Sequence, residues 1–193
     1  MPSTSLHRWK TVRASELDEI AHAHAAVGGS ARGRRFTTQQ INRAFAVLLA
    51  SQFQGFCRDL HTECVEHVLR VLAPPPPLQI LVHAEFTRGR QLDRGNAQSG
   101  SIGADFARLG IHLWDRLQTY DPASSGWRSN LDLLNEWRNA IAHQDFSSPR
   151  VIGTVNLRLA TVRQWRNSCL RLARAMEEVM RRHLQTATGV SPW

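Results

Sequence analysis

One short stretch of the chain combines an arginine and a histidine at a spacing that suits phosphate chemistry. Residues 130–146 read NLDLLNEWRNAIAHQDF, with Arg138 five positions before His143. A guanidinium binds phosphate oxygens through charge-assisted hydrogen bonds, and an imidazole moves protons near neutral pH. Together they are the minimum set of groups for cleaving RNA without a metal ion.

The same stretch has the periodicity of an amphipathic helix at about 100° per residue. Its apolar arc consists of Leu133, Leu134, Trp137, Ala140 and Ile141. Its opposite, polar arc consists of Asp132, Asn135, Glu136, Asn139 and His143. Arg138 lies at the edge of the polar arc, so that Arg138 and His143 flank one surface strip. A phosphodiester fits along that strip.

The expected reaction is attack of an RNA 2′-hydroxyl on the adjacent phosphate, which leaves a 2′,3′-cyclic phosphate. His143 would serve as base or acid, and Arg138 would neutralise the pentacoordinate transition state. Asn139 would hydrogen-bond and orient His143, or hold a phosphate oxygen. Because cleavage needs two proton-moving groups, two copies of the chain are expected to complete the site. No metal or other cofactor is expected.

At these residues the chain resembles the HEPN domains (higher eukaryote and prokaryote nucleotide-binding), most closely the prokaryotic RiboL-PSP-type branch. The resemblance covers roughly residues 36–183 and rests on the helix order and on Arg138-Asn139-x-x-x-His143. It implies an all-helical and usually dimeric domain. In active members, Arg and His residues of two protomers face each other in one composite endoribonuclease site, and a defence or toxin-antitoxin context with a partner or antitoxin protein follows.

The chain departs from part of this family at one position. Some HEPN toxins carry a tyrosine two residues after the histidine, which a partner nucleotidyltransferase modifies to silence them. Here that position is Asp145, and the only tyrosine is Tyr120. Silencing by that route is therefore not expected, although another antitoxin mechanism stays open.

Composition limits the architecture and the partner class. At 193 residues with 42% hydrophobic content, the chain suffices for one sizeable core and is short for two. Its formal net charge is +8, and Lys10 is the only lysine. This arginine excess favours a polyanion such as RNA, and the alternative is a solvated arginine surface. The chain lacks a long apolar run and a secretory signal pattern, so a cytoplasmic location without a membrane partner is expected.

The apolar periodicity predicts an all-α bundle of four to five core helices behind an N-terminal helical appendage, and the resemblance implies that the bundle is HEPN-like. The expected domain limits are 1–35 for the appendage and basic linker, 36–185 for the helical domain, and 186–193 for a tail. The predicted helices cover residues 15–27, 38–72, 78–92, 102–117 and 130–143, with a last helix that opens at Thr154. Ser129 is the expected N-cap of the motif helix, and Pro74–Pro77 are expected to stop the second helix.

Several other polar residues are open to two interpretations. Arg88, Arg90 and Arg94 either line a nucleic-acid groove or keep a loop soluble. Arg58, Asp59, His61 and Glu63 either support the motif or are solvated helix residues, and the latter is favoured for each. The functional alternatives to a nuclease are a non-catalytic HEPN-like module that binds RNA or nucleotide or mediates dimerisation, and a helical scaffold without a ligand.

Overall fold

The computed structural model describes residues 1–28, 35–147, 151 and 156–193, and within them it contains helices and no strand. The prediction of an all-α helical bundle is therefore confirmed. In chain order the elements are α1 (Thr4–Arg8), η1 (Trp9–Arg13), α2 (Ala14–Gly28), α3 (Arg35–Leu72), α4 (Pro76–Thr87), η2 (Gln91–Asp93), α5 (Ser99–Ala107), α6 (Leu113–Tyr120), α7 (Ser124–His143) and α8 (Leu159–Thr188). In the part of the chain that is described, no helix is both long and apolar enough to cross a membrane.

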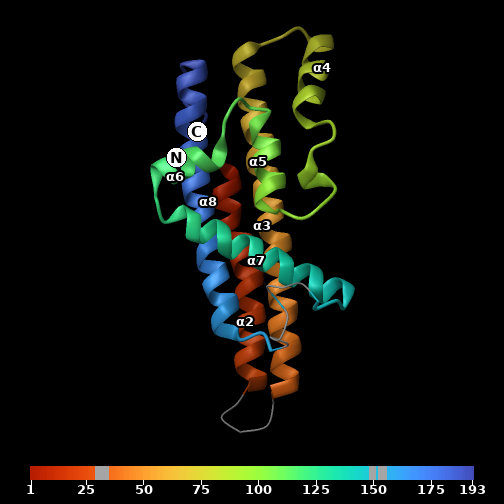
Figure 1. Cartoon of the computed structure of the whole chain (residues 1–193). Coiled ribbons are helices and arrows are strands. Elements are labelled where there is room, and N and C mark those ends of the chain that lie inside the picture. The colour runs from red at the N-terminus through yellow and green to blue at the C-terminus, as the bar shows by residue number, and fades with distance from the viewer. Residues whose placement is uncertain (29–34, 148–150, 152–155) are drawn as a thin grey trace.

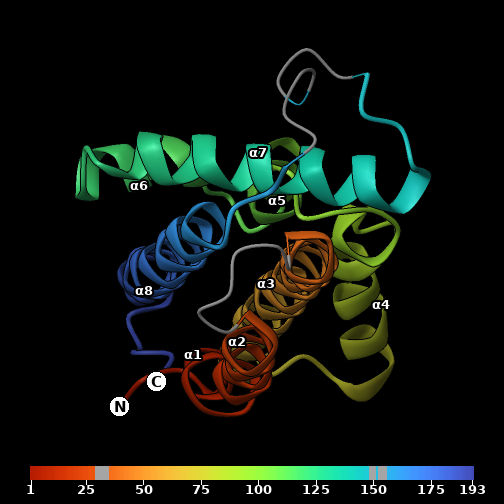
Figure 2. The same cartoon turned by 90° about the horizontal axis from the view of Figure 1, so that it is seen from below.

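The helices form layers around the two longest ones (Figure 1). In Figure 2, α3 and α8 lie side by side, with α1 and α2 on one side of them and α5, α6 and α7 on the other. Phe45, Phe53 and Phe56 of α3 are fully buried, as is Trp165 of α8 apart from 1% of its surface. The stripe of apolar residues at spacings of three and four in both helices therefore forms the common core.

The N-terminal helices contribute to this core. Leu6, Trp9 and Leu17 are buried, and the Trp9 ring lies 5.6 Å from the ring of Phe53 at an edge-on angle. Glu63 of α3 accepts hydrogen bonds from the first backbone amides of α1. The proposed division of the chain at residue 35 stays a prediction.

The proline run ends one helix and begins the next. α3 stops at Leu72, as predicted, and Pro75 has the extended backbone of a polyproline spacer. The next helix begins earlier than predicted, at Pro76, because proline fits the first helical turn, where no amide hydrogen bond is lost. That helix also ends earlier, at Thr87, and Gly89 with φ of 72° turns the chain away.

Two other predicted boundaries were wrong. The single helix expected at 102–117 is two helices, because the chain turns through Gly110, whose φ is 77°. The motif helix begins at Ser124, so Ser129 is not its N-cap and instead donates its hydroxyl to the carbonyl of Ser125. Thr154, the predicted start of the last helix, lies outside the described residues.

Candidate functional site

The motif helix α7 lies across α3 and α8 with one face in the core. Its buried apolar residues are Leu131, Leu134, Trp137 and Ala140, while Leu133 and Ile141 are half-buried against them. The Trp137 ring packs 6.3 Å from that of Trp165 and 6.2 Å from that of Phe146. The apolar arc deduced from the sequence is thus the face that fixes the helix in place.

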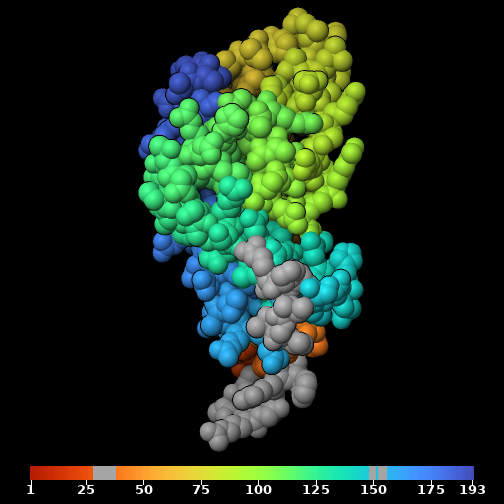
Figure 3. Space-filling model, viewed as in Figure 1, coloured from red at the N-terminus to blue at the C-terminus, as the bar shows by residue number. Residues whose placement is uncertain are grey.

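Arg138 and His143 line one open pocket of about 350 Å³ at the C-terminal end of α7. Its other lining residues are Gln54, Asp93, Arg94, Gly95, Asn96 and Asn139. This end of α7 lies at the surface of the molecule (Figure 3). The structure therefore brings the three residues of the motif to one solvent-accessible hollow. We call it the α7 pocket.

Asn139 has a defined orientation in this pocket. Its Oδ1 accepts hydrogen bonds from Nη1 of Arg138, at 3.2 Å, and from Nδ2 of Asn96. Because a guanidinium only donates, the atom that faces Arg138 must be the amide oxygen. The Asn139 amide nitrogen is then left as a donor. Among the described residues, no hydrogen bond joins Asn139 to His143, so the expected orienting bond between them is absent.

His143 is exposed and is the last residue of α7. The helix ends because Gln144 adopts the left-handed conformation, with φ of 55°. Beyond it, hydrogen bonds from Ser147 hold the pKa of Asp145 below its usual range, and the neighbouring His143 contributes a smaller effect in the same direction. The carboxylate of Asp145, two residues after His143 in the sequence, therefore interacts with the imidazole.

The rest of the predicted polar arc is less exposed than its sequence suggests. Asn135 is only 1% exposed and donates Nδ2 to the carbonyl of Ala97. Asp132 accepts hydrogen bonds from the amide and the hydroxyl of Ser99. Asp132 and Asn135, two of the five residues of the polar arc, therefore bond to the start of α5 and the segment before it.

Arg88, Arg90 and Arg94 lie in three different environments. Arg94 lines the α7 pocket. Arg90 is 7% exposed, and its guanidinium engages both carboxylate oxygens of Asp93, at 3.0 and 2.9 Å. Arg88 is exposed outside the pocket. The sequence offered no means to separate the three, because the distinction depends on how this segment meets α3 and α7.

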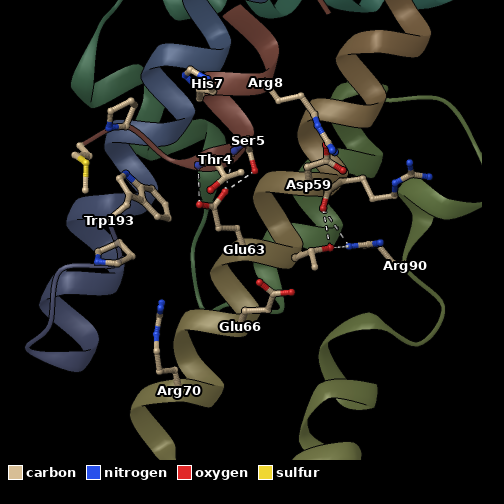
Figure 4. A pocket seen from close by; sticks show the side chains of 15 residues that line it. Thr4, Ser5, His7, Arg8, Asp59, Glu63, Glu66, Arg70, Arg90 and Trp193 are labelled. Carbon is tan, nitrogen blue, oxygen red and sulfur yellow. Dashed lines mark hydrogen bonds and ion pairs between the residues drawn. The ribbon is translucent and has the colours of Figure 1, made fainter. Parts of the chain in front are cut away.

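The polar residues of α3 that were weighed as support for the motif lie around a different hollow. This larger hollow, of about 1010 Å³, is lined by α1, α3, Arg90 and the C-terminal Trp193, and we call it the α1 groove (Figure 4). There Asp59 pairs with Arg8 and Arg13, and Glu63 caps α1. The favoured alternative, that these are solvated helix residues, fits the exposed Arg58. It does not fit His61, which is fully buried, and Asp59 and Glu63 are bound within the fold.

His61 is buried in α3, with its ring edge-on to that of Phe106 of α5. Its Nε2 is 3.1 Å from the carbonyl oxygen of Asp105, and its Nδ1 is 3.4 Å from Nη1 of Arg90. Burial, with the nearby Arg90 charge as the second cause, lowers the pKa of His61 to about 4. It is therefore neutral at physiological pH.

Metal-binding and thiol chemistry have less support. No group of three or more potential metal-ligating side chains occurs among residues 1–28, 35–147, 151 and 156–193. Cys57, Cys64 and Cys169 are buried, and burial raises the pKa of each thiol. The three cysteines are therefore small core residues.

No protein-family model matches the chain, and neither a curated protein nor a solved structure matches it.

Proposed function

We propose that the chain is a metal-independent endoribonuclease of HEPN type, with Arg138, Asn139 and His143 in a composite site between two copies. The observation that carries the proposal is the α7 pocket, where a phosphate-binding arginine and an exposed histidine share one open hollow. The arginine-rich composition agrees with an RNA substrate. A defence or toxin-antitoxin context, with an antitoxin or other partner protein, belongs to the same proposal.

In this mechanism the RNA 2′-hydroxyl attacks the neighbouring phosphorus and the 5′-oxygen of the next nucleotide leaves. One His143 takes the hydroxyl proton, and a second His143 gives a proton to the leaving oxygen. Arg138 donates to the phosphate oxygens, whose negative charge increases in the transition state. The amide nitrogen of Asn139 is a further donor to the same phosphate, because its oxygen is engaged by Arg138 and Asn96.

The need for two histidines is what leads us to propose a homodimer. His143 lies at the exposed end of α7, where a second copy has access to it. Two α7 ends that meet there would put two Arg138 and two His143 side chains around one phosphate. Light scattering at micromolar concentration tests this arrangement. A 21.8 kDa monomer over the whole concentration range would contradict the composite site.

The catalytic test is cleavage of a labelled RNA in the presence of EDTA. His143→Ala should lower turnover by about 10²–10⁴-fold, the usual contribution of a general acid or base, with little change in RNA binding. Arg138→Ala should lower turnover and also weaken binding, because it removes a phosphate contact. Cleavage by the unmutated chain should survive chelation and leave 2′,3′-cyclic phosphate ends.

Matched controls separate the site from general effects of charge. His112→Ala removes another exposed histidine, and Arg116→Ala removes another exposed arginine, both outside the α7 pocket. Both controls should cleave normally. Cleavage that persists in His143→Ala, or that EDTA abolishes, would overturn the proposal. RNA binding without any cleavage would support the non-catalytic binding module instead.

A further inference from the structure

Arg94 is an exposed cation of the α7 pocket that the proposed mechanism does not use. Its side chain has no hydrogen bond or ion pair within the described part of the chain. It belongs to the segment between α4 and α5. An arginine on a flexible loop would contribute little, because ordering it on binding costs conformational entropy. The contribution of Arg94 to binding therefore depends on how rigidly the fold holds its segment.

The first half of that segment is fixed from α3 and α5. The two carboxylate oxygens of Asp105 accept the backbone amides of Gln91 and Leu92, each at 2.8 Å. Gln54 of α3 donates Nε2 to the carbonyl of Leu92, also at 2.8 Å. The Leu92 side chain is fully buried. The backbone two residues before Arg94 is thus bonded on both sides and anchored in the core.

The second half is fixed from α7. Asp132, Asn135 and Asn139 follow each other at spacings of three and four, so they lie along one line of the helix. In the same order, they bond Ser99, Ala97 and Asn96. Segment 96–99 therefore runs along α7, held by a side chain in each successive turn of the helix.

The last of these bonds joins the segment directly to the motif. Arg138 fixes the orientation of the Asn139 amide, and the same Asn139 oxygen accepts from Asn96, two residues after Arg94. The side chain of Asn96 is therefore held in one orientation, with its amide nitrogen towards Asn139. The guanidinium of Arg94 is presented to the pocket from a backbone that is held before and after it. Such prior ordering lowers the entropy cost of binding.

We propose that Arg94 binds a second phosphate of the RNA, next along the strand to the phosphate held by Arg138, and that the Asn96–Asn139 hydrogen bond positions it. This inference rests on the proposed function for the identity of the ligand. It makes the substrate a strand that contributes at least two consecutive phosphates. Asn139 then has a positioning role through Asn96 in addition to its free amide donor.

The test measures binding of a fully 2′-O-methylated RNA ten-mer, which cannot be cleaved because its attacking hydroxyls are blocked. Arg94→Ala should weaken binding about tenfold at moderate salt, and the slope of log affinity against log salt should fall by about 0.7. The control is Arg88→Ala, which removes the same charge from an exposed position of the same segment outside the pocket. It should change affinity by less than about twofold.

Asn96→Ala tests the positioning role. It should weaken binding about threefold on its own and add nothing to Arg94→Ala, because both substitutions remove the same contact. A double variant whose losses multiply would overturn the positioning role. Circular dichroism and thermal melting should be unchanged in all three variants, since none of these side chains fills the core.

The outcomes distinguish this inference from the proposed function. Equal losses in Arg94→Ala and Arg88→Ala would overturn the inference and leave the nuclease proposal standing. Binding with the predicted Arg94 dependence but without cleavage of unmodified RNA would support the inference and overturn the nuclease. No binding by the unmutated chain would overturn both.

Discussion

The two hollows of this protein use similar residues in opposite ways. In the α1 groove, the charged side chains largely bond to one another and to the backbone of the fold: Asp59 to Arg8 and Arg13, and Glu63 to the start of α1 (Figure 4). In the α7 pocket, the side chains of Arg94 and His143 have no hydrogen bond or ion pair within the described residues.

Carboxylates differ between the two hollows as well. Asp59, Glu63 and Glu66 line the α1 groove, where they would repel a phosphate. The one carboxylate that lines the α7 pocket, among described residues, is Asp93, and Arg90 engages both of its oxygens. The larger hollow is therefore the weaker candidate for a polyanion. Unused donors, rather than volume, indicate where an anion binds.

The largest expected effect is a loss of stability when a core residue of α7 is truncated. Trp137 is 4% exposed and packs against Trp165 on the far side of α7 from the pocket. Trp137→Ala should lower the free energy of unfolding by about 3–5 kcal/mol, because it leaves a cavity in the core. Urea denaturation measures this change in the free energy of unfolding. Trp127→Ala, at a half-buried position, is the control and should cost less. Equal losses would contradict the deeper packing assigned to Trp137.

The next effect concerns the buried histidine His61. Its pKa is about 4 in the folded chain and near 6.5 when unfolded, so the unfolded state binds the proton more tightly. Neutral His61 makes its full contribution to the free energy of unfolding above about pH 6.5. This contribution is lost as pH falls towards 4, by roughly 3 kcal/mol. His67, whose pKa is also lowered by burial, acts in the same direction.

Unfolding by urea at pH 7, 5.5 and 4.5 measures this loss. His61→Gln should flatten the decline, because the variant has no proton to take up at that position. His67→Gln is the control and should leave most of the decline in place, since His67 is less deeply desolvated. A decline that is unchanged in His61→Gln would contradict the role assigned to its burial.

The smallest effect tests whether the α1 groove is structural. Glu63 accepts hydrogen bonds from the amides of Thr4 and Ser5 and from the Ser5 hydroxyl. Glu63→Ala should therefore cost about 1–2 kcal/mol of stability, as loss of a helix cap does, and should not weaken RNA binding. Glu66→Ala, at an exposed position of the same groove, should stay within about 0.5 kcal/mol. A change in RNA affinity comparable to that of Arg94→Ala would assign RNA to the groove as well.

Periodic patterns predicted the long helices well and the breaks poorly. The stripe of α3 and its end before the prolines followed from spacing and from the missing amide donors of Pro74–Pro77. The division of 102–117 into two helices did not follow, because its apolar residues also suit one continuous helix. The turn uses Gly110 in the left-handed conformation, which glycine adopts without strain but which its presence in the sequence does not require.

The sequence by itself determined the all-helical architecture and the presence of Arg138, Asn139 and His143 on one helix whose other face is apolar. Both are local properties, since 3.6 residues per turn convert spacing into direction. Only the tertiary structure decided which other residues join them. Gln54, Arg94 and Asn96 come from segments distant in sequence. Their approach depends on hydrogen bonds to Asp105, Asn135 and Asn139, which no sequence spacing encodes.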